Sequence, residues 1–185
     1  MRLFIAVAVD GDVRAEIRCA IDRFPIEPPP WRWSSPETWH LTLKFLGETS
    51  TDQLERALAA LDAVRAHHAA FDATLGRFGA FPDLRSPRVL FYRVEQGAPA
   101  LAALAREIDT ALEAAIGLEP ESRPFHAHVT VARIQDPLPA SVASRLATVP
   151  ALVAPVFRVS TFTLTESRLT RTGAQYSVVK PFALS

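Results

Sequence analysis

The pattern of apolar and polar residues predicts a series of β-strands. Residues 3–9 are continuously apolar and end at Asp10-Gly11, which is typical of a buried strand. Residues 39–46 alternate between polar and apolar side chains, which predicts a strand with one face in the core. The same criteria predict further strands over residues 71–81, 88–94, 126–134, 156–164 and 175–182.

Helical spacing of apolar residues predicts four helices between these strands. Ser50 followed by Gln53 indicates a capping box, which opens a helix that runs to about His67. Gly117 is a typical stop for the alanine-rich helix over residues 98–116. The other two helices are predicted over residues 12–24 and 137–149. Runs of strands separated by helices favour an α+β fold over a doubly wound α/β fold.

The composition is that of one globular domain. The chain has 185 residues, of which 49% are hydrophobic and 22% are charged. The 20 acidic residues balance the 20 lysines and arginines. This neutrality argues against nucleic-acid binding through the net charge of the protein, but it allows a local basic pocket. A single cysteine, Cys19, excludes an internal disulfide framework and a cysteine-rich zinc site.

No apolar run reaches the roughly 20 residues that a membrane-spanning helix needs. The apolar first segment is short and is followed at once by Asp10 and Asp12. We therefore interpret it as a buried strand rather than a signal peptide, and we expect a cytoplasmic protein without membrane contact.

A short repeat carries the candidate chemistry. His40-Leu41-Thr42-Leu43 and His128-Val129-Thr130-Val131 both read His, apolar, Thr, apolar, and both lie on predicted strands. Because strand side chains alternate, each histidine shares a face with its threonine. If the two strands lie side by side, two imidazoles and two hydroxyls surround one point. The alternative is two strands whose polar faces are incidental.

These groups suit phosphate chemistry. Two histidines can serve as general base and general acid at neutral pH, one on each side of an in-line displacement. Two threonine hydroxyls can bind phosphate oxygens, so a phosphodiester or cyclic phosphate reacts without a metal. A competing hypothesis is a metal site of His40, His126 and His128. No carboxylate motif accompanies that set, which favours His126 as a solvated residue at the rim of the site.

The motifs and their surroundings resemble the RNA 2′,3′-cyclic phosphodiesterases, or 2′-5′ RNA ligases, of the two-histidine (2H) phosphoesterase superfamily. The similarity spans nearly the whole chain. It rests on the segments RLFIAV (2–7), PETWHLTLKFLGE (36–48), RPFHAHVTVAR (123–133), ESRL (166–169) and GAQY (173–176).

The resemblance implies a single domain over residues 1–185 with two pseudo-symmetric lobes. It implies a bilobal α+β fold in which two antiparallel sheets flank a central cleft, with helices on the outside. The implied activity is hydrolysis of 2′,3′-cyclic phosphates at RNA 3′ ends or on nucleotides to 2′-phosphates, without cofactor or metal, and a reverse 2′-5′ ligation. We expect a monomer. The alternative is a binding module for nucleotides or RNA ends that has the same fold and no turnover.

The resemblance implies catalytic roles for His40 and His128, and it favours His128 as base and His40 as acid. With ordinary histidine pKa values near 6.5, the rate optimum is expected at roughly pH 6–8. Thr42 and Thr130 are expected to bind the phosphate.

Further residues are open to two interpretations each. Arg133 is a candidate to bind the phosphate, or it is an exposed or ion-paired arginine. Strand alternation places it on the face opposite to that of His128 unless the strand bulges or ends there. Strand alternation places Lys44 on the same face as His40 and Thr42, so it either extends the positive site or lies at a solvated strand end. Phe45 and Tyr176 are candidates for base stacking or for the core. Trp31 and Trp33 form a lid or pack against the proline-rich loop between residues 25 and 36.

Overall fold

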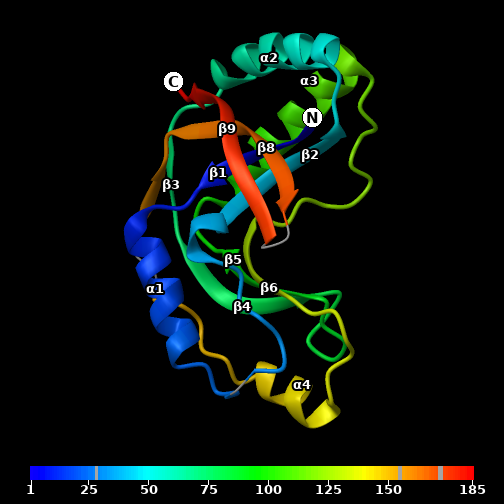
Figure 1. Ribbon diagram of the computed structural model, residues 1–185. Coiled ribbons are helices and arrows are strands. Elements are labelled where there is room, and N and C mark those ends of the chain that lie inside the picture. The colour runs from blue at the N-terminus through cyan, green and yellow to red at the C-terminus, as the bar shows by residue number, and fades with distance from the viewer. Residues whose placement is uncertain (28, 154–155, 171–172) are drawn as a thin grey trace.

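The computed structural model describes residues 1–27, 29–153, 156–170 and 173–185, and its fold is α+β (Figure 1). A seven-stranded antiparallel sheet has the order β4-β5-β6-β2-β1-β8-β9. Its strands are β1 (Arg2–Ala8), β2 (His40–Glu48), β4 (Leu75–Phe81), β5 (Val89–Val94), β6 (His128–Arg133), β8 (Thr161–Thr170) and β9 (Gly173–Ala183).

The sheet consists of two halves that meet at one residue pair. Leu41 of β2 pairs with Val129 of β6, and this is the single register pair between the two strands. Next to it, Trp33 bridges to Ala132. The two antiparallel sheets expected from the sequence are therefore the halves β4-β5-β6 and β2-β1-β8-β9 of one continuous sheet.

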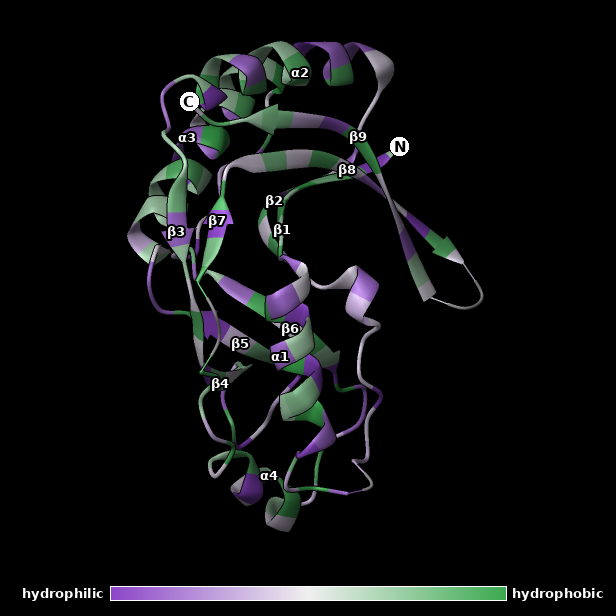
Figure 2. Cartoon of the chain, turned by 90° about the vertical axis from the view of Figure 1, so that its left-hand side faces the viewer, coloured by the Kyte–Doolittle hydropathy of each residue, from purple (hydrophilic) through white to green (hydrophobic). Residues whose placement is uncertain are grey.

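The helices divide between the two halves. Helices α2 (Thr51–Arg65) and α3 (Ala98–Ile116) pack on each other and contact β9 and β2, respectively. Helices α1 (Gly11–Asp22) and α4 (Ala140–Leu146) lie with the β4-β5-β6 half (Figures 1 and 2). The capping box and the glycine stop form as expected: Ser50 and Gln53 cap α2 reciprocally, and Gly117 ends α3 in the left-handed conformation.

Two predicted strands divide, because the chain passes from one sheet to another in the middle of each. The segment 71–81 splits into β3 (Phe71–Ala73) and β4, and the segment 156–164 splits into β7 (Phe157–Val159) and β8. β3 and β7 pair with each other in a separate two-stranded sheet. The helix predicted over 137–149 is shorter than expected: it begins at Ala140, because Pro139 disfavours the helical conformation at Leu138, and Pro139 is its N-cap.

The aromatic residues of the proline-rich loop pack in or against the core. Trp31 is buried, and its ring lies 5.9 Å from that of Phe24. Trp33 lies 4.8 Å from the same ring. Of the two interpretations of these tryptophans, the structure supports packing and not a lid. No helix among the described residues is long and apolar enough to cross a membrane.

Candidate active site

Both motif strands carry a bulge directly after their threonine. In β2 the extra residue is Leu43, because its neighbours Thr42 and Lys44 pair with successive residues of β1. In β6 the extra residue is Val131, because its neighbours Thr130 and Ala132 pair with successive residues of β5. A bulge reverses the alternation of side chains. The residue three positions after each threonine therefore returns to the face of the histidines.

This reversal decides the position of three candidate residues. Phe45 lies on the face of His40 and has 62% of its surface exposed. Arg133 occupies the equivalent place in β6 and is also exposed, so the bulge that brings it to the face of His128 does occur. Lys44 is 8% exposed and forms an ion pair with Asp109 of α3. Both sequence-based interpretations of Lys44 were wrong, because the bulge turns its side chain toward the helices.

The two His-x-Thr motifs lie on one face of the sheet, which we call the site face. Leu41 and Val129, the pair that joins the two halves, are both fully buried on the opposite face. The residues that flank Leu41 and Val129 in their strands point to the opposite face of the sheet from this pair. Directly paired residues of neighbouring strands point to the same face, so the flanking residues of both strands share one face. The antiparallel register thus brings His40 and Thr42 of one strand next to His128 and Thr130 of the other.

The two imidazoles are oriented in the same way. Nδ1 of His40 lies 2.6 Å from the carbonyl oxygen of Thr38, and Nδ1 of His128 lies 2.6 Å from that of His126. A carbonyl oxygen only accepts, so each Nδ1 carries a proton and donates it. This leaves both Nε2 atoms for chemistry. Nε2 of neutral His40 accepts a hydrogen bond from the Thr42 hydroxyl at 3.0 Å.

Aromatic rings surround His40. The ring of Phe4 lies 5.0 Å from the imidazole, and that of Tyr176 lies 5.3 Å away at 90°. Phe4 also contacts Phe45 at 6.1 Å. Tyr176 is 38% exposed, so it and Phe45 present an accessible aromatic surface beside His40. The structure thus places both stacking candidates outside the core.

Aromatic rings and cations surround His128. Phe81 and Phe91 lie 5.1 and 5.0 Å from the imidazole. Arg93 is its register partner on β5. Gly79 makes room for this arrangement, because a Cβ there would lie 2.7 Å from the Phe91 ring. Sequence reasoning missed these residues, since they lie on β4 and β5 and no motif marks them.

Both histidines have lowered pKa values. Burial is the largest cause for each, and it outweighs the hydrogen bond from Nδ1, which favours the charged form. The positive charges of His128 and Arg133 lower the pKa of His40 further. His126, Arg133 and Arg93 do the same for His128. Arg133 thus acts electrostatically on both imidazoles.

The described residues contain no group of three His, Cys, Asp or Glu side chains that could hold a metal ion. His126, the third member of the hypothetical metal set, has an exposed side chain 6.2 Å from Phe81. The backbone carbonyl of His126 orients the ring of His128.

A buried ion pair links the strand of the first motif to the segment that leads to the second. Nζ of Lys44 contacts the Asp109 carboxylate and donates to the carbonyl oxygen of Glu119 at 3.0 Å. The other carboxylate oxygen of Asp109 accepts from the N–H of Glu121 at 3.0 Å. The segment 119–125 precedes His126, so this cluster helps to hold β6 in place beside β2.

An antiparallel sheet that presents two His-x-Thr strands on one face has the arrangement of a two-histidine phosphoesterase. The chain belongs to the 2′-5′ RNA ligase superfamily, whose family model matches residues 32–171. It is 33% identical over 190 residues to the RNA 2′,3′-cyclic phosphodiesterase of Thermus thermophilus, covering 100% of this chain and 90% of that protein. It is equally 33% identical over 189 residues to the RNA 2′,3′-cyclic phosphodiesterase of Escherichia coli, covering 100% and 97%.

Solved structures share the fold. The crystal structure of TT0787 of Thermus thermophilus matches with a TM-score of 0.81 and 32% identity, covering 100% of this chain and 98% of that one. Escherichia coli LigT complexed with NADP+ also matches with a TM-score of 0.81, at 29% identity and 100% and 97% coverage.

Proposed function

We propose that this protein is an enzyme that hydrolyses 2′,3′-cyclic phosphates at RNA 3′ ends or on nucleotides to 2′-phosphates. The single observation that carries the proposal is the pair of imidazoles on one face, each with Nδ1 bound to a carbonyl and Nε2 left for proton transfer. The named activity of the relatives supports it. Two complete motifs argue against a binding module without turnover.

His128 is the general base and His40 the general acid. The aromatic surface of Phe45 and Tyr176 lies beside His40, so a nucleoside stacked there brings its ribose and its 3′-oxygen to that side. Water then attacks from the opposite side, next to His128. More cations surround His128 than His40, which favours the neutral imidazole that a base requires.

The reaction transfers one proton at each histidine. Nε2 of His128 takes a proton from water as its oxygen attacks phosphorus. The bond from phosphorus to the 3′-oxygen breaks, and His40 donates a proton to that oxygen. Thr42, Thr130 and Arg133 stabilise the charge on the non-bridging oxygens, and no cofactor is needed. The phosphate stays on the 2′-oxygen. One domain with two lobes suffices, and we expect it to act as a monomer.

Incubation with 2′,3′-cyclic AMP in the presence of EDTA tests this function. We expect 2′-AMP as the product on chromatography, formed at the same rate with and without the chelator. Loss of activity that one divalent ion restores would show that the reaction needs a metal. If 3′-AMP is the main product, the acid and the base are placed the wrong way round the phosphate. If the protein binds the nucleotide but does not convert it, the protein is a binding module and not an enzyme.

The pH profile follows from the pKa directions. The acid must be protonated and the base neutral, so the profile is bell-shaped. Both pKa values are lowered in the free enzyme. The optimum of kcat/KM therefore lies on the acidic side of the range that unperturbed histidines predict. The bound phosphate is anionic and raises both values, so we expect the kcat profile at higher pH than that of kcat/KM.

A further inference from the structure

Each motif is held firmly within its own half of the sheet, but the junction between the halves is short. β2 pairs with β1 over residues 40–48, and β6 pairs with β5 over residues 128–133. Between β2 and β6, Leu41 and Val129 form the single register pair. The distance from one imidazole to the other therefore depends on contacts that lie beyond this pair.

Ser34, which lies outside both motifs, extends the junction. Continuing the register from Leu41 by two residues would place Trp39 opposite Val131, but β2 begins one residue after Trp39. The loop before β2 takes the place of the strand. The backbone N–H and the hydroxyl of Ser34 both donate to the carbonyl oxygen of Val131, at 2.8 and 2.7 Å.

Trp39 completes the junction through its side chain. Its indole N–H donates to the Ser34 hydroxyl at 3.1 Å, and the tryptophan is only 2% exposed. The hydroxyl thus accepts from one half of the sheet and donates its single proton to the other. Trp39 directly precedes His40, and Val131 directly follows Thr130. The junction therefore fastens the start of one motif to the end of the other.

The same loop orients the imidazole of His40. The carbonyl of Thr38, which accepts from Nδ1 of His40, belongs to the short 3-10 helix Pro36–Thr38. The N–H and the hydroxyl of Thr38 bind the carbonyl oxygen of Ser35, at 2.9 and 2.7 Å. Because Ser35 directly follows Ser34, a shift of Ser34 against β6 would also move the carbonyl that holds the imidazole.

We propose that Ser34 is a positioning residue for the reaction, because its hydroxyl fixes the spacing at which the acid and the base meet one phosphate. The inference rests on the proposed function, since it takes His40 and His128 as that acid and base. In-line displacement needs both groups aligned with the forming and breaking bonds, and a displacement of about 1 Å can cost about 100-fold in rate.

Replacement of Ser34 tests the proposal. Ser34→Ala removes the hydroxyl and keeps the backbone N–H. We expect kcat for 2′,3′-cyclic AMP to fall by about 10- to 100-fold. KM should stay nearly unchanged, because Phe45 and Tyr176, which stack on the base, both lie in the His40 half. Ser34→Thr restores a hydroxyl at the same place and should recover most of the rate.

Combination with His128→Ala separates positioning from a loss of folded protein. Without the base, the acid has no partner with which it must be aligned. Adding Ser34→Ala to His128→Ala should therefore lower the remaining rate far less than Ser34→Ala lowers the rate of the unaltered enzyme. A general loss of folded enzyme would reduce both rates by the same factor. Urea unfolding checks that each variant is folded under the assay conditions.

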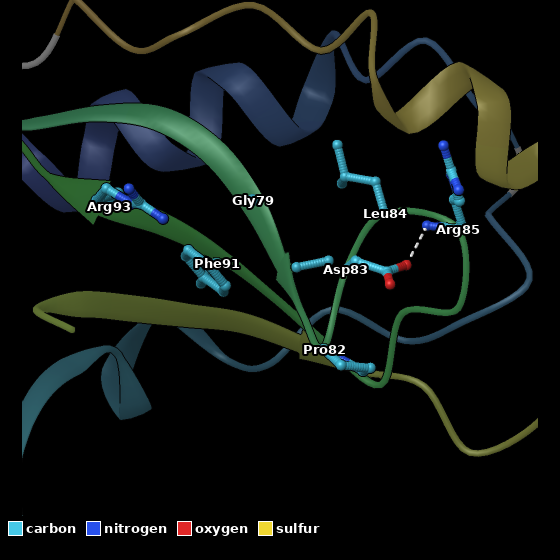
Figure 3. A pocket seen from close by; sticks show the side chains of 8 residues that line it. Gly79, Pro82, Asp83, Leu84, Arg85, Phe91 and Arg93 are labelled. Atoms are coloured by element: carbon cyan, nitrogen blue, oxygen red, sulfur yellow. Dashed lines mark hydrogen bonds between the residues drawn. The ribbon is translucent and has the colours of Figure 1, made fainter. Parts of the chain in front are cut away.

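Two control variants remove hydrogen bonds that stay within one half. Ser35→Ala removes the neighbouring hydroxyl, which donates to the Glu37 carboxylate of the same loop. Asp83→Ala removes a carboxylate that accepts from the N–H groups of Arg85 and Ser86, at 2.7 and 3.0 Å. These bonds lie in the loop between β4 and β5, beside a pocket of the His128 half (Figure 3). Because neither variant affects the junction, both should keep kcat.

The other outcomes are decisive as well. If kcat of Ser34→Ala equals that of the unaltered enzyme, the inference is overturned and the proposed function stands. Equal losses with and without His128→Ala also overturn it, because Ser34 then acts on folding alone. A comparable loss in either control variant does the same, because the junction is then not special. If the unaltered protein hydrolyses no cyclic phosphate, the proposed function fails, and the inference fails with it.

Discussion

The two halves of the site present the same motif in different surroundings. His40 and His128 have matching hydrogen bonds at Nδ1, and the burial patterns of residues 40–45 and 128–133 are identical. Beyond this shared frame, the His40 half presents accessible aromatic rings and the His128 half presents arginines. Under the proposed function, this difference is what makes one repeat the acid and the other the base: the shared frame orients both imidazoles, and their neighbours distinguish them.

Removing either histidine should have the largest effect. His40→Ala and His128→Ala should each lower kcat for cyclic AMP by about 10³-fold or more, the scale of acid–base catalysis, and the double variant little further. Rates of the single and double variants measure this. A rate in His128→Ala equal to that of the unaltered enzyme would move the second role to His126.

The threonines should come next. Thr42→Ala and Thr130→Ala should each cost about 2–4 kcal/mol in kcat/KM, the scale of one hydrogen bond to a charge that develops in the transition state. Only Thr42 bonds to its own histidine, so its variant should also change the pH profile. A variant with the full rate would remove that hydroxyl from the phosphate site.

The residue that follows the bulge differs between the two halves, and we expect this difference to affect the free energy of unfolding. Lys44 is ion-paired there in β2, whereas β6 has Ala132. Lys44→Met should lower the free energy of unfolding by about 3 kcal/mol, because the carboxylate of Asp109 loses its buried partner. Urea unfolding measures this, and Lys44→Met with Asp109→Asn should recover part of the loss. No recovery would mean that the Lys44 side chain acts by packing alone.

The aromatic surface should affect substrate binding. Phe45→Ala should raise KM for 2′,3′-cyclic AMP by the equivalent of about 1–3 kcal/mol, the range for stacking on one base, with little change in kcat. Tyr176→Phe is the matched control, because it keeps a ring beside His40. If KM is unchanged in Phe45→Ala, the base binds elsewhere.

The smallest effect concerns the arginines at His128. Arg93 lowers the pKa of His128 but is not among the causes for His40, whereas Arg133 acts on both. Removing a positive neighbour makes protonation easier, so Arg93→Gln should raise the pKa of His128 alone, and Arg133→Gln should raise both. NMR titration of the imidazole protons distinguishes the two. Equal shifts of both histidines in Arg93→Gln would contradict the placement of Arg93.

Local patterns in the sequence predicted most of the helices and strands and the repeated motif. Apolar periodicity located the strands and the four helices, and the Ser50 cap and the Gly117 stop are local chemistry that acts within one turn. The repeat of His, apolar and Thr at positions 40 and 128 predicted the candidate reacting groups and their shared face, because side-chain alternation is also local.

The tertiary structure alone decided which side chains join those groups. The bulges at Leu43 and Val131 depend on pairing with β1 and β5, and they bring Phe45 and Arg133 to the site face and send Lys44 to the helices. The joining of two expected sheets into one depends likewise on a single contact between distant strands. Such pairings form between segments far apart in the chain, so no local pattern of side chains records them.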